Sequence, residues 1–211
     1  EVPLAGIPAR ALEDYLGRLL RLGRRVAICE QVEDPAEAKG IVRREVVETV
    51  SPGAVLSDRL LEARRPNHFA AIAGGPGDPV LGLAWADVST GEFAAALVPG
   101  AELASELGRL EVSELLLPQA WEGAALELDR DPARTYREDW RFDPELGREE
   151  LARHYGVHGL EGFGVRPDGS DAPAVAAAGA LLAHLREMQP AGVRHLRPLR
   201  MERGQEALVL D

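Results

Sequence analysis

The residues in this sequence best suited to chemistry are a lone cysteine and groups of acids, histidines and arginines. Cys29 is the chain's only cysteine, and it is followed by Glu30, Gln31, Glu33 and Asp34. A catalytic thiol needs an electropositive setting that favours the thiolate, and acidic neighbours have the opposite effect. We therefore expect Cys29 to pack as a small apolar side chain at the end of a buried strand.

Asp87, within the run WADVSTGEF, is the strongest candidate for metal chemistry. Glu92 and Asp143 are the carboxylates that would complete a cluster able to hold two metal ions. In the competing interpretation, Asp87 accepts hydrogen bonds from the backbone amides of the turn at residues 89–91. The sequence favours the turn, and two-metal chemistry stays open as the alternative.

The histidines and glycines give weaker signals. His154 and His158 have the spacing of two metal ligands on one helix, but Gly156 between them should end that helix. The run GLEGFGV lacks the third glycine of a dinucleotide-binding loop, and no G-x-x-x-x-G-K-[ST] phosphate loop occurs anywhere. The pattern favours no metal or nucleotide site, and we expect a loop that presents Phe163.

Arginines supply nearly all the positive charge, because Lys39 is the only lysine among 24 basic residues. The net charge of −11 opposes non-specific DNA binding by the chain as a whole, but it is compatible with a local basic patch. Arg10 stands at the start of an expected helix, and Arg43 and Arg44 lie in an expected strand. Residue types alone favour a solvated face over phosphate contact for these arginines.

The elements around these residues fall into two units. In the first, apolar residues recur at helical spacing between a proline and a glycine, which predicts an amphipathic helix over 9–22. The stripe consists of Leu12, Tyr15, Leu16, Leu19 and Leu20. Strands are expected at 25–29 and 41–50, with a short helix at 35–40 between them. These elements are too few to close a core, so we expect a domain that begins before this sequence.

The second unit starts with three antiparallel strands joined by short turns. The strands are expected at 68–75, 80–88 and 92–98, followed by a helix at 101–110, a strand at 113–118 and a helix at 145–156. This order is typical of a ribonuclease H-like α/β domain. A metal-dependent nuclease and a stand-alone protein-interaction module are therefore alternative functions. A long buried helix is expected at 173–189.

Composition narrows the class of protein. With 45% hydrophobic residues the chain is able to bury a core, yet it contains no apolar stretch of the ~18 residues that a membrane helix needs. One cysteine cannot form an internal disulfide, and the first residues carry no secretion signal. These features predict a cytoplasmic location.

Several long runs together resemble one family, the bacterial MutS proteins of DNA mismatch repair. LAGIP and RVAICEQVEDPAEAKGIVRREVVETVSPGAV resemble the end of that family's mismatch-recognition domain. WADVSTGEF, LEGFGV, AAGALLAHLREMQ and HLRPLRMERGQEALVLD resemble its connector domain and the entry into its core domain. The order and spacing of these runs extend along nearly the whole chain.

The resemblance implies a domain plan and a fold. Residues 1–53 would be the C-terminal part of the recognition domain, residues 54–66 a linker, and residues 67–172 the connector. Residues 173–211 would form a connector-to-core helix and the start of the core domain. The fold class is then α/β, with a ribonuclease H-like connector of mixed sheet and helices after an incomplete α/β recognition domain. The connector of this family is not a nuclease.

The resemblance also implies the function and its sites. Members of the family are homodimers that encircle duplex DNA, sense a mispair with a Phe-x-Glu wedge, and use ATP and Mg to recruit MutL. Neither the wedge nor the ATPase occurs within these 211 residues, so we expect no enzyme activity and no cofactor here. Arg10 and Arg44 match positions that contact the DNA backbone. Glu149 and Glu150 are the expected MutL-facing residues.

Overall fold

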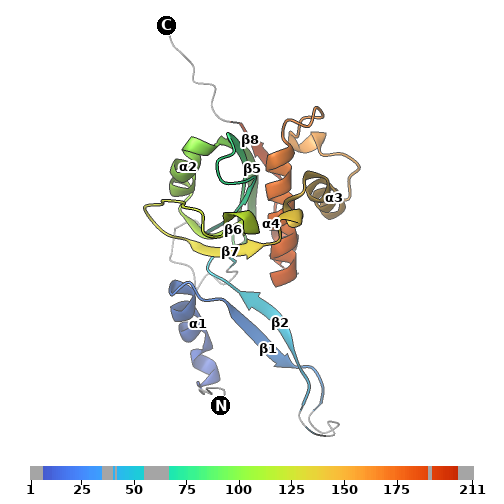
Figure 1. Ribbon diagram of the computed structural model, residues 1–211. Helices are drawn as coiled ribbons and strands as arrows, with labels where there is room; N and C mark the ends of the chain where they lie inside the picture. The colour runs from blue at the N-terminus through green and yellow to red at the C-terminus, as the bar shows by residue number, and fades with distance from the viewer. Residues whose placement is uncertain (1–6, 35–39, 41, 55–66, 190–191, 204–211) are drawn as a thin grey trace.

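The computed structural model describes residues 7–34, 40, 42–54, 67–189 and 192–203, arranged as two parts (Figure 1). We call residues 7–54 the N-terminal part and residues 67–203 the sheet domain. The expected short helix at 35–40 and the linker at 54–66 fall almost entirely outside the described residues. Within the described part of the chain, no helix is long and apolar enough to cross a membrane.

The N-terminal part consists of a helix beside a two-stranded ribbon. A short 3₁₀ turn, η1 (Ala9–Ala11), leads into α1 (Leu12–Arg21), and β1 (Val26–Gln31) pairs antiparallel with β2 (Arg44–Val50). Gly23, at φ +70°, ends the helical region, which confirms the predicted stop. The helix over 9–22 and both strands are therefore confirmed, although β1 extends two residues further than predicted and β2 starts three residues later.

Burial in the N-terminal part differs from the prediction. Only two residues of the α1 stripe, Leu16 and Leu20, are buried, against Val50 of β2, while other members of the stripe face solvent. The exposed members are Leu12, Tyr15 and Leu19. One helix against one ribbon covers only a narrow strip of apolar surface, so the rest of the stripe has nothing to pack on among the described residues.

The same geometry corrects the expectation for Cys29. β1 is a strand as predicted, but it is not buried, and Cys29 is an exposed free thiol. Successive side chains of a strand point to opposite faces. Val26 and Ile28 pack towards α1, whereas Ala27 and Cys29 lie on the face that α1 does not cover. The cysteine therefore does not fill a core.

The sheet domain is built on a six-stranded mixed sheet in the order β7-β6-β3-β4-β5-β8. Its strands are β3 (His68–Ala73), β4 (Val80–Asp87), β5 (Glu92–Pro99), β6 (Val112–Pro118), β7 (Ala133–Arg137) and β8 (Arg200–Glu202). The predicted antiparallel meander β3-β4-β5 is confirmed, and β6, β7 and β8 each run parallel to a neighbour. The sequence did not predict β7, because the surrounding residues 119–143 carry no clear period.

Helices cover both faces of this sheet (Figure 1). One core lies under η2 (Gly100–Glu102), α2 (Leu103–Arg109) and η3 (Gln119–Trp121). The other lies under η4 (Asp139–Phe142), α3 (Pro144–Tyr155), η5 (Glu161–Phe163), α4 (Ala172–Met188) and η6 (Gly192–His195). Two covered faces explain why β3 is buried along its whole length.

Small residues let α4 approach its neighbours closely. It is buried along most of its length, as its alanine-rich sequence predicted. A side chain at Gly179 would clash with Gly147 of α3, and one at Gly82 would clash with the backbone where α4 begins. This crossing turns α3 so that Leu151 is fully buried and Leu146 is 42% exposed.

The packing of α4 also bears on the expected division between residues 172 and 173. α4 shares a core with β3, β4 and β5, and β8 adds to the edge of the same sheet beside β5. α4 and β8, which the expected plan placed after this division, pack within the sheet domain. The last residues of the expected start of the core domain, 204–211, lie outside the described residues.

Candidate functional site

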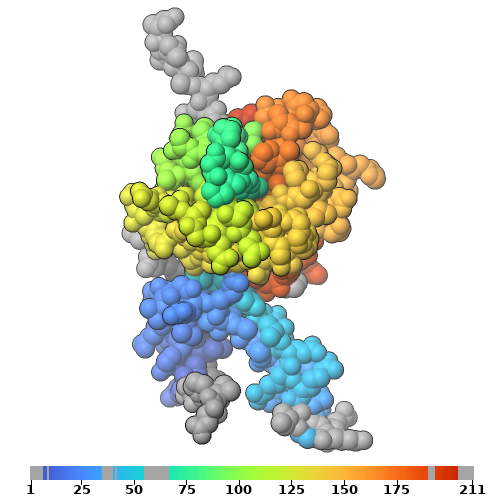
Figure 2. Space-filling view, viewed as in Figure 1, coloured from blue at the N-terminus to red at the C-terminus, as the bar shows by residue number. Residues whose placement is uncertain are grey.

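The two expected DNA-contacting arginines stand at the end of the N-terminal part remote from the sheet domain. Arg10 lies in η1, which precedes α1, and Arg44 is the first residue of β2. The start of α1 and the far end of the ribbon extend away from the sheet as separate projections (Figures 1 and 2). Both arginines are exposed.

The pairing of these arginines differs from that of their neighbour. Arg43 is held locally, since its guanidinium pairs with Glu45 at 2.5 Å and its backbone amide donates to Glu33. Within the described residues, no hydrogen bond or ion pair holds the guanidinium group of Arg10 or Arg44, although the backbone of Arg44 pairs with Gln31 in the ribbon. Their guanidinium groups are thus available to phosphate, although no contact joins the two.

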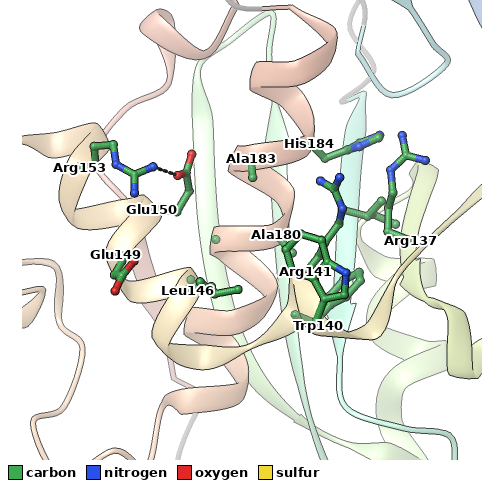
Figure 3. A pocket seen from close by; sticks show the side chains of 14 residues that line it. Arg137, Trp140, Arg141, Leu146, Glu149, Glu150, Arg153, Ala180, Ala183 and His184 are labelled. Atoms are coloured by element: carbon green, nitrogen blue, oxygen red, sulfur yellow. Dashed lines mark hydrogen bonds and ion pairs between the residues drawn. The ribbon is translucent and has the colours of Figure 1, made fainter.

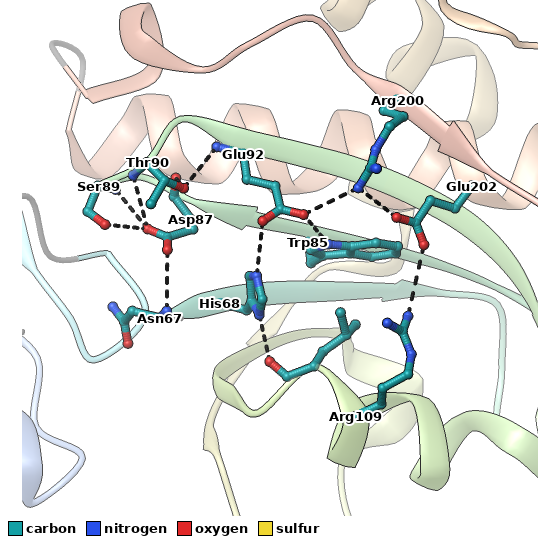
Figure 4. Close-up of polar contacts among 11 residues, drawn as sticks. Asn67, His68, Trp85, Asp87, Ser89, Thr90, Glu92, Arg109, Arg200 and Glu202 are labelled. Carbon is teal, nitrogen blue, oxygen red and sulfur yellow. Dashed lines mark hydrogen bonds and ion pairs between the residues drawn. The ribbon is translucent and has the colours of Figure 1, made fainter. Parts of the chain in front are cut away.

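Asp87 has the turn role that the sequence favoured (Figure 4). Its carboxylate accepts hydrogen bonds from the Ser89 amide at 2.9 Å, the Ser89 hydroxyl at 2.6 Å and the Thr90 amide at 3.3 Å. The side chain is 3% exposed, so these donors replace the water that the carboxylate loses on burial. Asp87 closes the β4-β5 turn.

Glu92 and Asp143, the other two carboxylates of the postulated metal cluster, also bind other groups. Glu92 lies opposite Asp87 across the hairpin, but it accepts from Trp85 and approaches His68 (Figure 4). Asp143 caps the start of α3, where it accepts the Glu145 amide at 2.9 Å. Among the described residues, no three His, Cys, Asp or Glu side chains lie close enough to hold a metal ion.

The histidine pair and the glycine loop also resolve into structural roles. α3 ends at Tyr155, and Gly156 adopts φ +66°, so His154 and His158 do not share a helix, as expected. Phe163 is partly buried instead of fully presented to solvent, because its ring stacks on Tyr155 with 4.6 Å between centroids. The Tyr155 hydroxyl in turn accepts the Leu199 amide, which ties α3 to the segment before β8.

The two glutamates expected to face a partner differ from each other. Glu149 is exposed on α3, as predicted. Glu150 is not: its side chain is 14% exposed, it pairs with Arg153 at 2.7 Å, and it also binds Arg186 of α4. Because Glu150 joins the two helices, the prediction that its side chain is exposed is wrong. Burial and the charge of Arg186 lower the pKa of the adjacent His154.

A pocket of about 190 Å³ opens beside these glutamates, between α3, α4, η4 and the end of β7 (Figure 3). Arg137 and His184 line it, together with the exposed Trp140 and Leu146. Burial, reinforced by the charges of Arg137, Arg25 and Arg141, lowers the pKa of His184 to about 3. His184 is therefore neutral at physiological pH, with one ring nitrogen a donor and the other an acceptor.

Sequence reasoning missed the junction between the two parts. Glu114 of β6 is 1% exposed, and it accepts from Arg25 at 3.0 Å, from Thr135 at 3.1 Å and from the Gly53 amide at 3.2 Å. A buried carboxylate bound by three donors is strongly held. The available signal was a lone acid in the otherwise apolar run VSELLLP.

Gln189, just after α4, forms the second half of the junction. Its amide nitrogen lies 2.8 Å from the Ala54 carbonyl, 3.0 Å from the Glu48 carboxylate and 3.5 Å from the Thr49 carbonyl. The side chain is 3% exposed. Hydrogen bonds therefore fix β2 and the residues after it to the end of α4, and Ala54 is also buried in the core under α4.

Comparison with protein families gives two matches, in the order in which they occur along the chain. A family model described as MutS domain I matches residues 1–59. A family model described as MutS domain II matches residues 67–197, well over half of the sequence. The two matches coincide closely with the N-terminal part and the sheet domain.

Proposed function

The chain belongs to the MutS family of DNA mismatch repair proteins, and we propose that it serves in recognising mispaired or unpaired bases in duplex DNA. In this proposal the N-terminal part supplies contacts to the DNA backbone, and the sheet domain is the connector. The observation that carries it is the pair of exposed arginines without local partners, Arg10 and Arg44, on the projections of the part that matches domain I.

Contacts to phosphate would position the protein on the duplex without reading its sequence. Identification of the mispair, ATP and Mg binding, and homodimer formation would belong to the rest of the full-length protein. The sheet domain is then a ribonuclease H-like connector without nuclease activity. Its strand order supports this assignment, because an antiparallel meander is followed by β6 and β7, both parallel to β3.

The junction gives the connector a physical role. Glu114 and Gln189 hold the DNA-facing part at a fixed orientation on the sheet domain. If DNA binding displaced the β1-β2 ribbon, β6 and α4 would therefore be displaced with it. We propose that MutL is recruited through the exposed surface of α3, where Glu149 is available and Glu150 acts only by holding α3 to α4.

The backbone-contact role can be tested with Arg44→Ala in the full-length protein. Loss of one phosphate contact should weaken binding to matched and mismatched duplexes by a similar factor and reduce the salt dependence of binding by about one unit of slope. Fluorescence anisotropy with both duplexes across a salt series measures this. Arg109→Ala is the control, since Arg109 is exposed on α2 and pairs with Glu106.

Two results would argue against the proposal. A loss confined to the mismatched duplex would mean that Arg44 reads the lesion instead of the backbone. An equal loss in Arg109→Ala would point to overall charge instead of a local contact. In addition, the 211-residue chain alone should neither turn over ATP nor prefer a mispaired duplex, and steady ATP hydrolysis by it would contradict the division of labour.

A further inference from the structure

The pocket between α3 and α4 contains buried polar atoms that nothing in the fold uses (Figure 3). His184 is 2% exposed, and both of its ring nitrogens lack a hydrogen-bond partner among the described residues. The same holds for Nε of Arg137, which also lines the pocket. Buried polar atoms are nearly always bonded, so three such atoms at one cavity indicate an occupant.

The charges around the pocket show which kind of occupant would fit. Arg141 is neutralised by Glu138 at 2.9 Å and Glu187 at 2.6 Å. Glu150, also at the pocket, is neutralised by arginines of α3 and α4. Among the arginines that line the pocket, Arg137 is the one that makes no ion pair within the described residues, and its Nε is unbonded. The unused groups are therefore one cationic fork and one neutral imidazole, which together suit a single anionic acceptor.

The rest of the lining is apolar. Phe142, Ala180 and Ala183 contribute to the walls. Two apolar residues at the opening are exposed to solvent, Trp140 to 61% and Leu146 to 42%. Glu149 also lines the pocket, and its charge disfavours a ligand with two negative charges. The volume is below the ~300–1,000 Å³ of pockets for drug-sized ligands, so the ligand is small.

We propose that this pocket binds a small monocarboxylate with an apolar body. The carboxylate accepts hydrogen bonds from Arg137 and His184 at the buried end, and the apolar body lies against Leu146 and Trp140 at the opening. The bound ligand would contact α3 and α4 next to the Glu150–Arg186 pair. It is separate from the DNA-facing projections of the N-terminal part.

Isothermal titration calorimetry of the full chain with three probes tests the chemistry. The probes are 3-phenylpropionate, its uncharged amide and inorganic phosphate. The carboxylate should bind at least tenfold more tightly than the amide, because charge-assisted hydrogen bonds to Arg137 are lost in the amide. It should also bind more tightly than phosphate. Equal affinity for the acid and the amide, or no heat with any probe, would overturn the proposal.

Variants locate the site. Arg137→Gln should weaken 3-phenylpropionate at least tenfold, and Trp140→Ala should weaken it severalfold by removing the apolar wall. Arg134→Gln is the matched control, because Arg134 is on the same strand, pairs with Asp131 and does not line the pocket. The affinity of this variant for 3-phenylpropionate should stay unchanged. Circular dichroism would verify that each variant is folded. An equal loss in Arg134→Gln, or none in Arg137→Gln, would refute binding at this pocket.

Discussion

The N-terminal part and the sheet domain bury their apolar residues to very different extents. In the sheet domain, helices cover both faces of the sheet, and strands such as β3 are buried throughout. In the N-terminal part the buried cluster consists of Leu16, Leu20 and Val50. Most of the exposed large apolar residues lie there as well.

This difference shows that the two parts depend on different interactions. The sheet domain is stabilised by apolar burial, which contributes in proportion to the area removed from water. The N-terminal part has little such area among the described residues, and it is fixed by polar contacts to Glu114 and Gln189. Changes to the core should therefore unfold the sheet domain, and changes to the junction should release the N-terminal part.

The largest effect is expected from Leu181→Ala in α4, where the side chain is fully buried. The cavity should lower the free energy of unfolding by about 2–5 kcal/mol. All three tryptophans lie in the sheet domain, so their fluorescence during urea unfolding reports that domain. The matched change Leu16→Ala in α1 should leave the tryptophan-monitored midpoint nearly unchanged. Equal shifts in the two variants would mean that the parts unfold as one unit.

The second-largest effect on stability is expected from Glu114→Gln at the junction. Removing the charge leaves Arg25 without its carboxylate and weakens three hydrogen bonds, at a cost of about 1–3 kcal/mol. Hydrogen exchange should become faster in β1 and β2 while β3 and β4 stay protected. Glu106→Gln, which removes one of the two carboxylate partners of Arg109 on the surface of α2, is the control. Uniformly faster exchange would contradict a local junction.

Acid should destabilise the sheet domain through His184. Its folded pKa is about 3, below the ordinary 6.5, so the unfolded state takes up a proton first. This contribution to stability is complete above pH 6.5 and is lost as pH falls towards 3, by up to ~1.4 kcal/mol per pH unit. Urea midpoints across this range measure the slope, and His184→Gln should flatten it. An unchanged slope in that variant would assign the acid sensitivity to other groups.

The smallest effect is expected from Cys29→Ser in β1. The thiol is exposed and fills no core, so the free energy of unfolding should change by no more than ~0.5 kcal/mol. The native protein should also react with Ellman's reagent at the rate of an open thiol. Slow reaction in the folded protein together with a large loss of stability would restore the buried role that the sequence suggested for Cys29.

The sequence predicted elements well wherever local pattern was strong. The period of apolar residues in α1, the proline start and alanine-rich surface of α4, and the turn at Asp87 were all visible in short windows. It failed for β7, whose five residues ARTYR show no clear alternation, and which is a strand because it pairs with β6. It also failed for Phe163, since its packing depends on Tyr155, a residue of another element that lies against its ring.

The sequence by itself therefore determined the family, the order of the elements and the two arginines worth testing, because these follow from residue types and spacing along the chain. The tertiary structure decided the rest. Cys29 faces solvent, Glu150 joins α3 to α4, Glu114 and Gln189 fix the two parts together, and His184 is left unpaired beside Arg137. Each of these roles depends on groups brought together from distant positions, and local pattern carries no information about such contacts.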